Sequence, residues 1–190
     1  VQFSGDNDSA TADGTAAGIQ YAADNGASVL QCSWGEPNGR PGTEEEYLQK
    51  FGVQADAFNY FINKKRPGSP LNGGIAIVSA GNDSFGLCSF PGGYSKVVCV
   101  TSMSTDYTPS TFTNFGAAAD ITAPGGDYHY HNNEAGGILS TLGEYHKYYG
   151  YMSGTSMSTP HVSGVAALAL SYAKQLGKTF EPDEFRDMLL

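Results

Sequence analysis

Ser156 is the residue whose position most directly predicts chemistry. It lies in residues 154–161 (GTSMSTPH), at the start of a long apolar stretch that predicts a buried helix. A serine there places its hydroxyl near unpaired backbone N–H groups and the positive end of the helix dipole. That environment can stabilise the oxyanion formed when a serine attacks a carbonyl group. The pattern also has a structural explanation, because serine and threonine commonly cap helices.

Pro160 favours the functional interpretation of this segment. In a helix that begins at Ser156, a proline at this position removes a backbone hydrogen bond just after the first turn. Departures from local helix rules tend to occur at functional sites, where the loss is compensated elsewhere. The helix start is therefore predicted to be a site of chemistry.

Several segments resemble the landmarks of the subtilisin-like serine proteases, in that family's order. Residues 154–168 (GTSMSTPHVSGVAAL) are similar to the nucleophile motif G-T-S-x-[SA]-x-P-H, which is followed by a helix of small residues. The other matching segments are residues 33–35 (SWG), 78–82 (VSAGN), 89–92 (SFPG), 111–116 (TFTNFG) and 121–125 (ITAPG). The resemblance extends from about residue 14 onward. It implies an α/β fold with three layers, α/β/α, around a mostly parallel central sheet that is truncated on its N-terminal side.

The resemblance also implies an activity and assigns roles to residues. The activity is that of a serine endopeptidase, which hydrolyses peptide bonds through an acyl-enzyme on Ser156. The side-chain amide of Asn82 and the backbone N–H of Ser156 would form the oxyanion hole. The implied substrate-binding residues are Ser33, Trp34 and Gly35 along one wall of the cleft, and Ala80, Gly81 and Asp83 around the pocket before the scissile bond. The Phe90–Pro91 bond matches a cis proline of the family.

A serine nucleophile needs a general base, and the base needs an orienting carboxylate. The family carries these residues in D-[ST]-G and H-G-T-H motifs, and neither motif occurs in the 190 residues. His161 is interpreted as a buried, structural imidazole that faces away from Ser156. The remaining histidines are the His129/His131 pair, read as part of a solvated hairpin or as metal ligands, and His146, read as a surface residue.

We therefore expect the isolated chain to be inactive unless it is complemented, and the N-terminal part of its own catalytic domain is the partner that would complement it. The alternative is a non-catalytic pseudo-protease module that binds peptides. The presence of both Ser156 and Asn82 argues against this alternative, because a binding module has no physical need for a nucleophile and an oxyanion donor.

The elements that position these residues follow from the apolar pattern. Alternating helices, glycines and short apolar runs are typical of a parallel α/β sheet. We expect helices over residues 14–25, 44–63, 156–176 and 181–190, and strands over 27–32, 75–79, 97–101, 120–123 and 137–141. Residues 1–190 are expected to form a single partial catalytic domain. Two insertions are expected, at about 36–70 and 125–137, placed to shape specificity or to bind an accessory domain. The second is predicted to be a polar hairpin.

Composition limits the partners. A net charge of −9 repels phosphate backbones, so nucleic acid is excluded as a partner. No apolar run reaches the roughly 20 residues that span a membrane, and no signal peptide is visible. An acidic, lysine-poor chain is typical of exported proteins, so we expect a secreted, cell-surface or periplasmic protein that acts on peptides or proteins.

Metal and disulfide chemistry have little support in the sequence. We expect no required cofactor. Asp120 matches a carboxylate at a weak cation site in some relatives, where backbone oxygens near Gly92, Tyr94 and Val97 would help, so a structural calcium or sodium ion stays as an alternative. The three cysteines lack zinc-ligand spacing. Cys32 and Cys99 are expected to be buried, and a bridge between Cys88 and Cys99 is left open.

Overall fold

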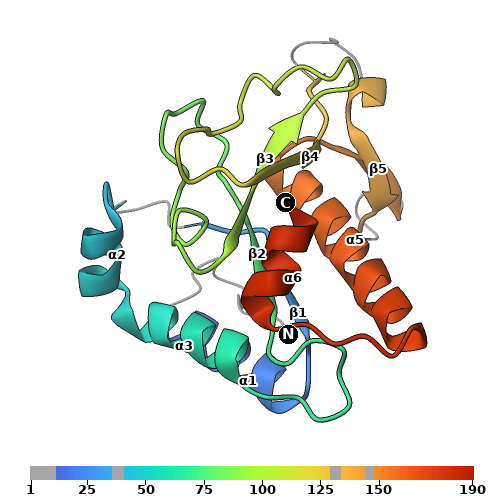
Figure 1. The fold of residues 1–190 in the computed structure, drawn as a ribbon. Coiled ribbons are helices and arrows are strands. Elements are labelled where there is room, and N and C mark those ends of the chain that lie inside the picture. The colour runs from blue at the N-terminus through green and yellow to red at the C-terminus, as the bar shows by residue number, and fades with distance from the viewer. Residues whose placement is uncertain (1–11, 36–40, 129–133, 144–147) are drawn as a thin grey trace.

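The computed structural model describes residues 12–35, 41–128, 134–143 and 148–190 (Figure 1). Within these residues one sheet contains four parallel strands in the order β1-β2-β3-β4. Their bounds are Val29–Cys32 (β1), Ile75–Ser79 (β2), Val98–Met103 (β3) and Ile121–Pro124 (β4). All five residues of β2 are buried, as expected for the central strand of a parallel sheet that is covered on both faces.

Helices cover both faces of this sheet (Figure 1). Their bounds are Ala12–Asp24 (α1), Glu44–Lys50 (α2), Gly52–Asn63 (α3), Thr155–Gln175 (α5) and Pro182–Leu189 (α6). Alternate side chains of β2 point to opposite faces. Ala76 and Val78 pack with α1 and α3, whereas Ile75 and Ile77 pack with α5 and α6. The predicted α/β/α arrangement with a parallel sheet is therefore confirmed.

The helix expected over residues 44–63 is in fact two helices. Phe51 ends α2 and precedes α3, with φ −126° and ψ 32°, outside the helical region. Gly52 follows it and has low helix propensity, which favours the break at this point. The side chains of Tyr47, Phe58 and Phe61 from these helices are fully buried. Much of the expected first insertion therefore belongs to the hydrophobic core.

The middle of the hairpin expected at 125–137 lies outside the described residues, so this hairpin stays a prediction. The described residues of that segment contain the short 3-10 helix Glu134–Gly136 and no strand. The antiparallel pair follows it, formed by β5 (Ile138–Thr141) and β6 (Tyr149–Met152). Strand β6 was missed because its sequence YGYM is short and lacks alternation of apolar and polar residues. His129, His131 and His146 lie outside the described residues.

Two further expectations concern covalent geometry. The peptide bond between Phe90 and Pro91 is cis, as predicted. Cys32, Cys88 and Cys99 are all buried and carry free thiols, so the Cys88–Cys99 bridge that the sequence left open is not formed. Burial raises the pKa of the Cys32 thiol to about 12, so this thiol is protonated at neutral pH and behaves as a small apolar group.

Candidate active site

Ser156 lies in the first turn of α5, next to the residue that follows β1. Its Oγ donates a hydrogen bond of 3.3 Å to the carbonyl oxygen of Ser33, and Ser33 Oγ donates one of 2.8 Å to the carbonyl oxygen of Ser156. These reciprocal bonds hold the end of β1 against the start of α5. Functional crevices of open parallel sheets lie beyond the carboxyl ends of the strands, and Ser156 is placed there.

Asn82 follows β2 and is held by the residue before Ser156. Its Oδ1 accepts hydrogen bonds from the backbone N–H of Thr155 at 2.8 Å and from Thr155 Oγ1 at 2.9 Å. Because Oδ1 is occupied by these donors, the N–H groups of Nδ2 point elsewhere. Nδ2 lies 3.6 Å from the position that a Cβ on Gly154 would take. An amide donor therefore sits beside the helix start, as an oxyanion hole requires.

Thr155 is a positioning residue that the sequence analysis missed. It is fully buried, and besides its two bonds to Asn82 its Oγ1 accepts a hydrogen bond of 3.3 Å from the Gly81 N–H. The threonine thus joins the loop after β2 to the first turn of α5. The G-T-S pattern marked its position, but a motif alone does not show which partner the hydroxyl contacts.

By the intact protein we mean this chain together with the N-terminal part of its catalytic domain. Thr155→Val is expected to lower kcat of the intact protein by about tenfold with little change in KM. The variant loses both Oγ1 hydrogen bonds, the one to Asn82 Oδ1 and the one from the Gly81 N–H, and keeps the backbone bond to Asn82. One hydrogen bond contributes about 0.5–1.5 kcal/mol. Thr155→Ser keeps the hydroxyl and is the matched control. Steady-state kinetics on a peptide substrate measure both constants. A loss in Thr155→Ser as large as in Thr155→Val would show that the hydroxyl does not position Asn82.

The loop that carries Asn82 is organised by Asn114. Asn114 Oδ1 accepts hydrogen bonds from the N–H groups of Asp83 (2.8 Å) and Phe85 (3.2 Å), and its Nδ2 donates to Ser89 Oγ at 3.1 Å. Gly81 in the same loop has φ +104°, and a Cβ there would lie 2.4 Å from Asn114 Nδ2. The loop conformation therefore requires glycine at position 81. The role of Asn114 was also missed, although it lies in the TFTNFG segment.

The predicted cleft residues differ in how they reach the site. Ser33 contacts Ser156 directly, and Gly35, two positions after Ser33, is exposed. The indole of Trp34, however, stacks on Phe58 of α3 at 6.4 Å between ring centroids and joins the core cluster of that layer. Ala80 is fully buried beneath the loop, whereas Asn82 and Asp83 are exposed. The part of Trp34 that faces the site is therefore its backbone.

A cavity of about 300 Å³ opens beside Ser156. Its lining residues are Ile138, Leu139, Ser140, Ser156, Met157, Pro160 and His161. Strand β5, which the sequence predicted over residues 137–141, forms one wall of the cavity, and the first turns of α5 form the other. The lining is mainly apolar and suits an apolar side chain next to Ser156.

The expectation for His161 is wrong in two respects. The imidazole is exposed, and it shares the cavity with Ser156 instead of facing away from it. Ser156 and His161 are five positions apart and therefore differ by about 140° around the helix axis. The cavity extends around the start of α5 and so reaches both side chains. The Nδ1 of His161 lies 2.8 Å from the carbonyl oxygen of Met157, within hydrogen-bonding distance. Within the described part of the chain, no imidazole is hydrogen-bonded to Ser156 Oγ.

Asp120, the candidate cation ligand, has other partners. Its Oδ2 accepts a hydrogen bond of 2.8 Å from the Cys99 N–H, and its Oδ1 accepts one of 2.9 Å from Arg186 Nη2. Arg186 Nη1 also donates to the carbonyl oxygen of Ser95 at 2.9 Å. The guanidinium therefore supplies the positive charge beside Asp120, and these residues do not fit a metal ion. No cluster of metal-ligating side chains occurs among the residues described here.

Replacing Arg186 is expected to destabilise the fold. Arg186→Met removes a partly buried ion pair and leaves Asp120 with one hydrogen bond, at a cost of about 1–3 kcal/mol. For a chain of this size the unfolding midpoint should fall by about 2–12 °C. Differential scanning fluorimetry measures the shift, with Lys178→Met as an exposed control. A midpoint equal to that of the control would contradict a structural role for the Arg186–Asp120 pair.

Comparison with known proteins places this arrangement in a family. The model of the Subtilase family matches residues 1–190. Thermitase of Thermoactinomyces vulgaris is 33% identical over 157 residues, which is 83% of this chain and 45% of thermitase. The extracellular basic protease of Dichelobacter nodosus is 35% identical over 124 residues, which is 62% of this chain and 19% of that protease. The structure of the self-cleaved protease domain of PatA is similar with a TM-score of 0.75 and 28% identity, over 98% of this chain and 61% of that one.

The chain thus spans less than two thirds of the length of each of these proteins. None of the described helices combines the length and the apolar character needed to cross a membrane. The parallel sheet, the order of the family-like segments along the chain and the family match over residues 1–190 agree with one another. The chain belongs to the subtilase family of serine proteases.

Proposed function

We propose that this chain carries the nucleophile and the oxyanion hole of a serine endopeptidase, which cleaves peptide bonds through an acyl-enzyme on Ser156. The observation that carries the proposal is the anchoring of Asn82. Two hydrogen bonds from Thr155 hold its Oδ1, which directs the amide N–H groups towards the start of α5. An amide held in this way costs no reorganisation when charge develops on the substrate.

The reaction follows from this arrangement. Ser156 Oγ attacks the scissile carbonyl carbon, its proton passes to a general base, and the carbonyl oxygen becomes an oxyanion. The donors to this oxyanion would be Asn82 Nδ2 and the backbone N–H of Ser156. The latter has no acceptor within the described residues, because it belongs to the first turn of α5. The base then returns the proton to the leaving amine, and water hydrolyses the acyl-enzyme.

The general base is proposed to come from the N-terminal part of the catalytic domain, which also completes the fold. Among the described strands β1 pairs with β2 alone, so its second edge can accept a further strand. Val165, Leu168 and Tyr172 of α5 are 56%, 73% and 62% exposed and follow one another along one side of the helix. An open strand edge beside an exposed apolar helix face supports the packing of more chain there.

The substrate is proposed to be a peptide or protein in extended conformation. Backbone of residues 33–35 lies beyond the end of β1 and is placed to pair with such a chain as an added strand. The apolar cavity between β5 and α5 would receive the side chain that follows the scissile bond. A secreted location is proposed because the relative from Dichelobacter nodosus is an extracellular protease.

Labelling with a fluorophosphonate tests these proposals, because the probe reacts only with an activated serine. The isolated 190-residue chain is expected to remain unlabelled, and addition of the N-terminal part of the catalytic domain is expected to restore labelling that Ser156→Ala removes. Labelling of the isolated chain that disappears in His161→Gln would assign the base to His161 instead. Absence of labelling even in the intact protein would favour a non-catalytic peptide-binding module.

A further inference from the structure

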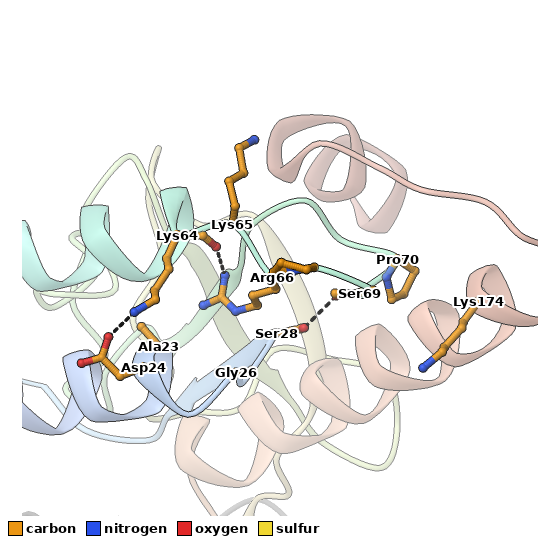
Figure 2. Close-up of a pocket in the computed structure, with 12 residues that line it drawn as sticks. Ala23, Asp24, Gly26, Ser28, Lys64, Lys65, Arg66, Ser69, Pro70 and Lys174 are labelled. Atoms are coloured by element: carbon orange, nitrogen blue, oxygen red, sulfur yellow. Dashed lines mark hydrogen bonds and ion pairs between the residues drawn. The ribbon is translucent and has the colours of Figure 1, made fainter.

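A second cavity lies far from Ser156, at the other end of α5. Its volume is about 550 Å³, and Figure 2 shows the residues that line it. Lys174 of α5 contributes to the lining, 18 residues after Ser156, which corresponds to about 27 Å along the helix axis. Ser28 also contributes and immediately precedes β1, so this cavity is at the amino ends of the strands, opposite the catalytic side.

The cavity concentrates positive charge in an acidic chain. The lining contains Lys64, Lys65, Arg66 and Lys174, which are four of the ten lysines and arginines in a sequence of net charge −9. Asp24 is the one carboxylate in the lining. An excess of cations around one concave surface raises the local concentration of anions. The feature therefore points to a negatively charged ligand.

Two of these cations already have carboxylate partners. Lys64 forms an ion pair with Asp24, which Figure 2 shows as a dashed line. Lys65 is paired with Glu181 at 3.3 Å and points away from the other side chains in Figure 2. Among the described residues no carboxylate pairs with Arg66 or Lys174. The uncompensated charge of the cavity thus resides on these two side chains.

Arg66 is the more unusual of the two. Its Nη1 and Nη2 donate to the carbonyl oxygens of Lys64 (2.6 Å) and Phe61 (2.9 Å), which fixes the guanidinium at the end of α3. The residue is only 7% exposed, and its Nε is buried with no hydrogen-bond acceptor in the described part of the chain. A buried charged donor without an acceptor is costly. Burial accordingly lowers the pKa of Arg66 from its usual value.

The two serines of the lining offer one more donor. Ser28 Oγ and Ser69 Oγ are hydrogen-bonded to each other at 3.0 Å, and Ser69 Oγ also accepts from the Leu71 N–H. The pair has two hydroxyl protons and uses one of them internally. The other proton remains available to an acceptor in the cavity. Hydroxyl, guanidinium and ammonium donors together are the set that oxyanions prefer.

We propose that this cavity binds a small oxyanion, a phosphate, sulfate or carboxylate group, between Arg66, Lys174 and the Ser28–Ser69 pair. The anion would accept a hydrogen bond from the serine hydroxyl and would neutralise the charges of Arg66 and Lys174, the two cations without a carboxylate partner among the described residues. Since the cavity lies at the opposite end of the strands from Ser156, the anion is a stabilising ligand and not a substrate. The anion binds the folded state and not the unfolded state, and it therefore raises the unfolding temperature.

The test is a comparison of unfolding midpoints of the intact protein in phosphate, sulfate, acetate and chloride at equal ionic strength. Phosphate at about ten times its dissociation constant should raise the midpoint by about 3–5 °C over chloride. Phosphate and sulfate also stabilise proteins in general, so variants are needed. Lys174→Gln and Ser28→Ala remove cavity donors, whereas Lys178→Gln removes an exposed charge outside the lining and is the matched control.

The proposal predicts that Lys174→Gln loses at least half of the phosphate-specific rise and that Lys178→Gln keeps all of it. Calorimetric titration with inorganic phosphate should show about tenfold weaker binding in Lys174→Gln. A rise with phosphate and sulfate alone would assign a tetrahedral anion, and an equal rise with acetate would assign a carboxylate. An equal rise in the wild type and Lys174→Gln, or none over chloride, would overturn the proposal.

Discussion

Ser156→Ala is expected to reduce kcat of the intact protein by about 10⁶-fold, the largest effect predicted for this chain. The variant removes the oxygen that is proposed to form the acyl-enzyme, and loss of the nucleophile costs about this much in subtilisin, a member of the same family. Little else should change, because the Ser156 hydroxyl makes one long bond of 3.3 Å to Ser33. The measurement is hydrolysis of a chromogenic peptide at saturating concentration.

Ser163→Ala is the matched control for this substitution. Ser163 lies in the same helix, and its Oγ donates to the carbonyl oxygen of Thr159 at 3.1 Å, so both variants lose one hydroxyl from α5. The control should retain nearly full activity and the same unfolding midpoint. Residual activity above about 1% in Ser156→Ala would show that another residue performs the attack.

Asn82→Ala is expected to lower kcat by about 10²–10³-fold while KM changes little. In the proposed mechanism the amide donates to the oxyanion, which exists in the transition state and not in the bound substrate, so its loss appears in kcat. The magnitude is that known for removal of the oxyanion-hole amide in subtilisin, a member of the same family. The constants are measured on a peptide substrate, together with an unfolding curve.

The unfolding curve is needed because Asn82 also accepts two hydrogen bonds from Thr155. Asn63→Ala controls for loss of an amide elsewhere, since Asn63 Nδ2 makes one exposed bond to the carbonyl oxygen of Asn59. A higher KM with unchanged kcat in Asn82→Ala would place Asn82 in substrate recognition and not in the oxyanion hole.

The sheet was predictable because its two inner strands, β2 and β3, lie in apolar runs. Strand β2 (IAIVS) is followed by Ala80 and Gly81, and strand β3 lies in an equally apolar run. Such runs fit a sheet that is buried on both faces, and their order fixes the carboxyl edge where Ser33 and Asn82 lie. The helix start at Ser156 was predictable for a similar reason, since residues 162–170 are mainly apolar.

Contacts between distant residues were not predictable from the same pattern. Arg186 and Asp120 are 66 positions apart, and neither sits in a sequence that favours an ion pair over a metal ligand. The bond from Thr155 to Asn82 spans 73 positions and depends on the relative placement of α5 and β2. The cavity that contains His161 requires β5, whose partner β6 has a sequence too short to identify. Each of these contacts is decided by tertiary packing.

Trapping of the acyl-enzyme tests the central claim most directly. The intact protein is mixed with an activated ester substrate, quenched in acid within milliseconds to seconds, digested and examined by mass spectrometry. The account predicts an acyl group on Ser156 that appears before steady-state turnover and disappears on longer incubation. Turnover with no adduct, or with the acyl group on another residue, would contradict the assignment of Ser156 as the nucleophile.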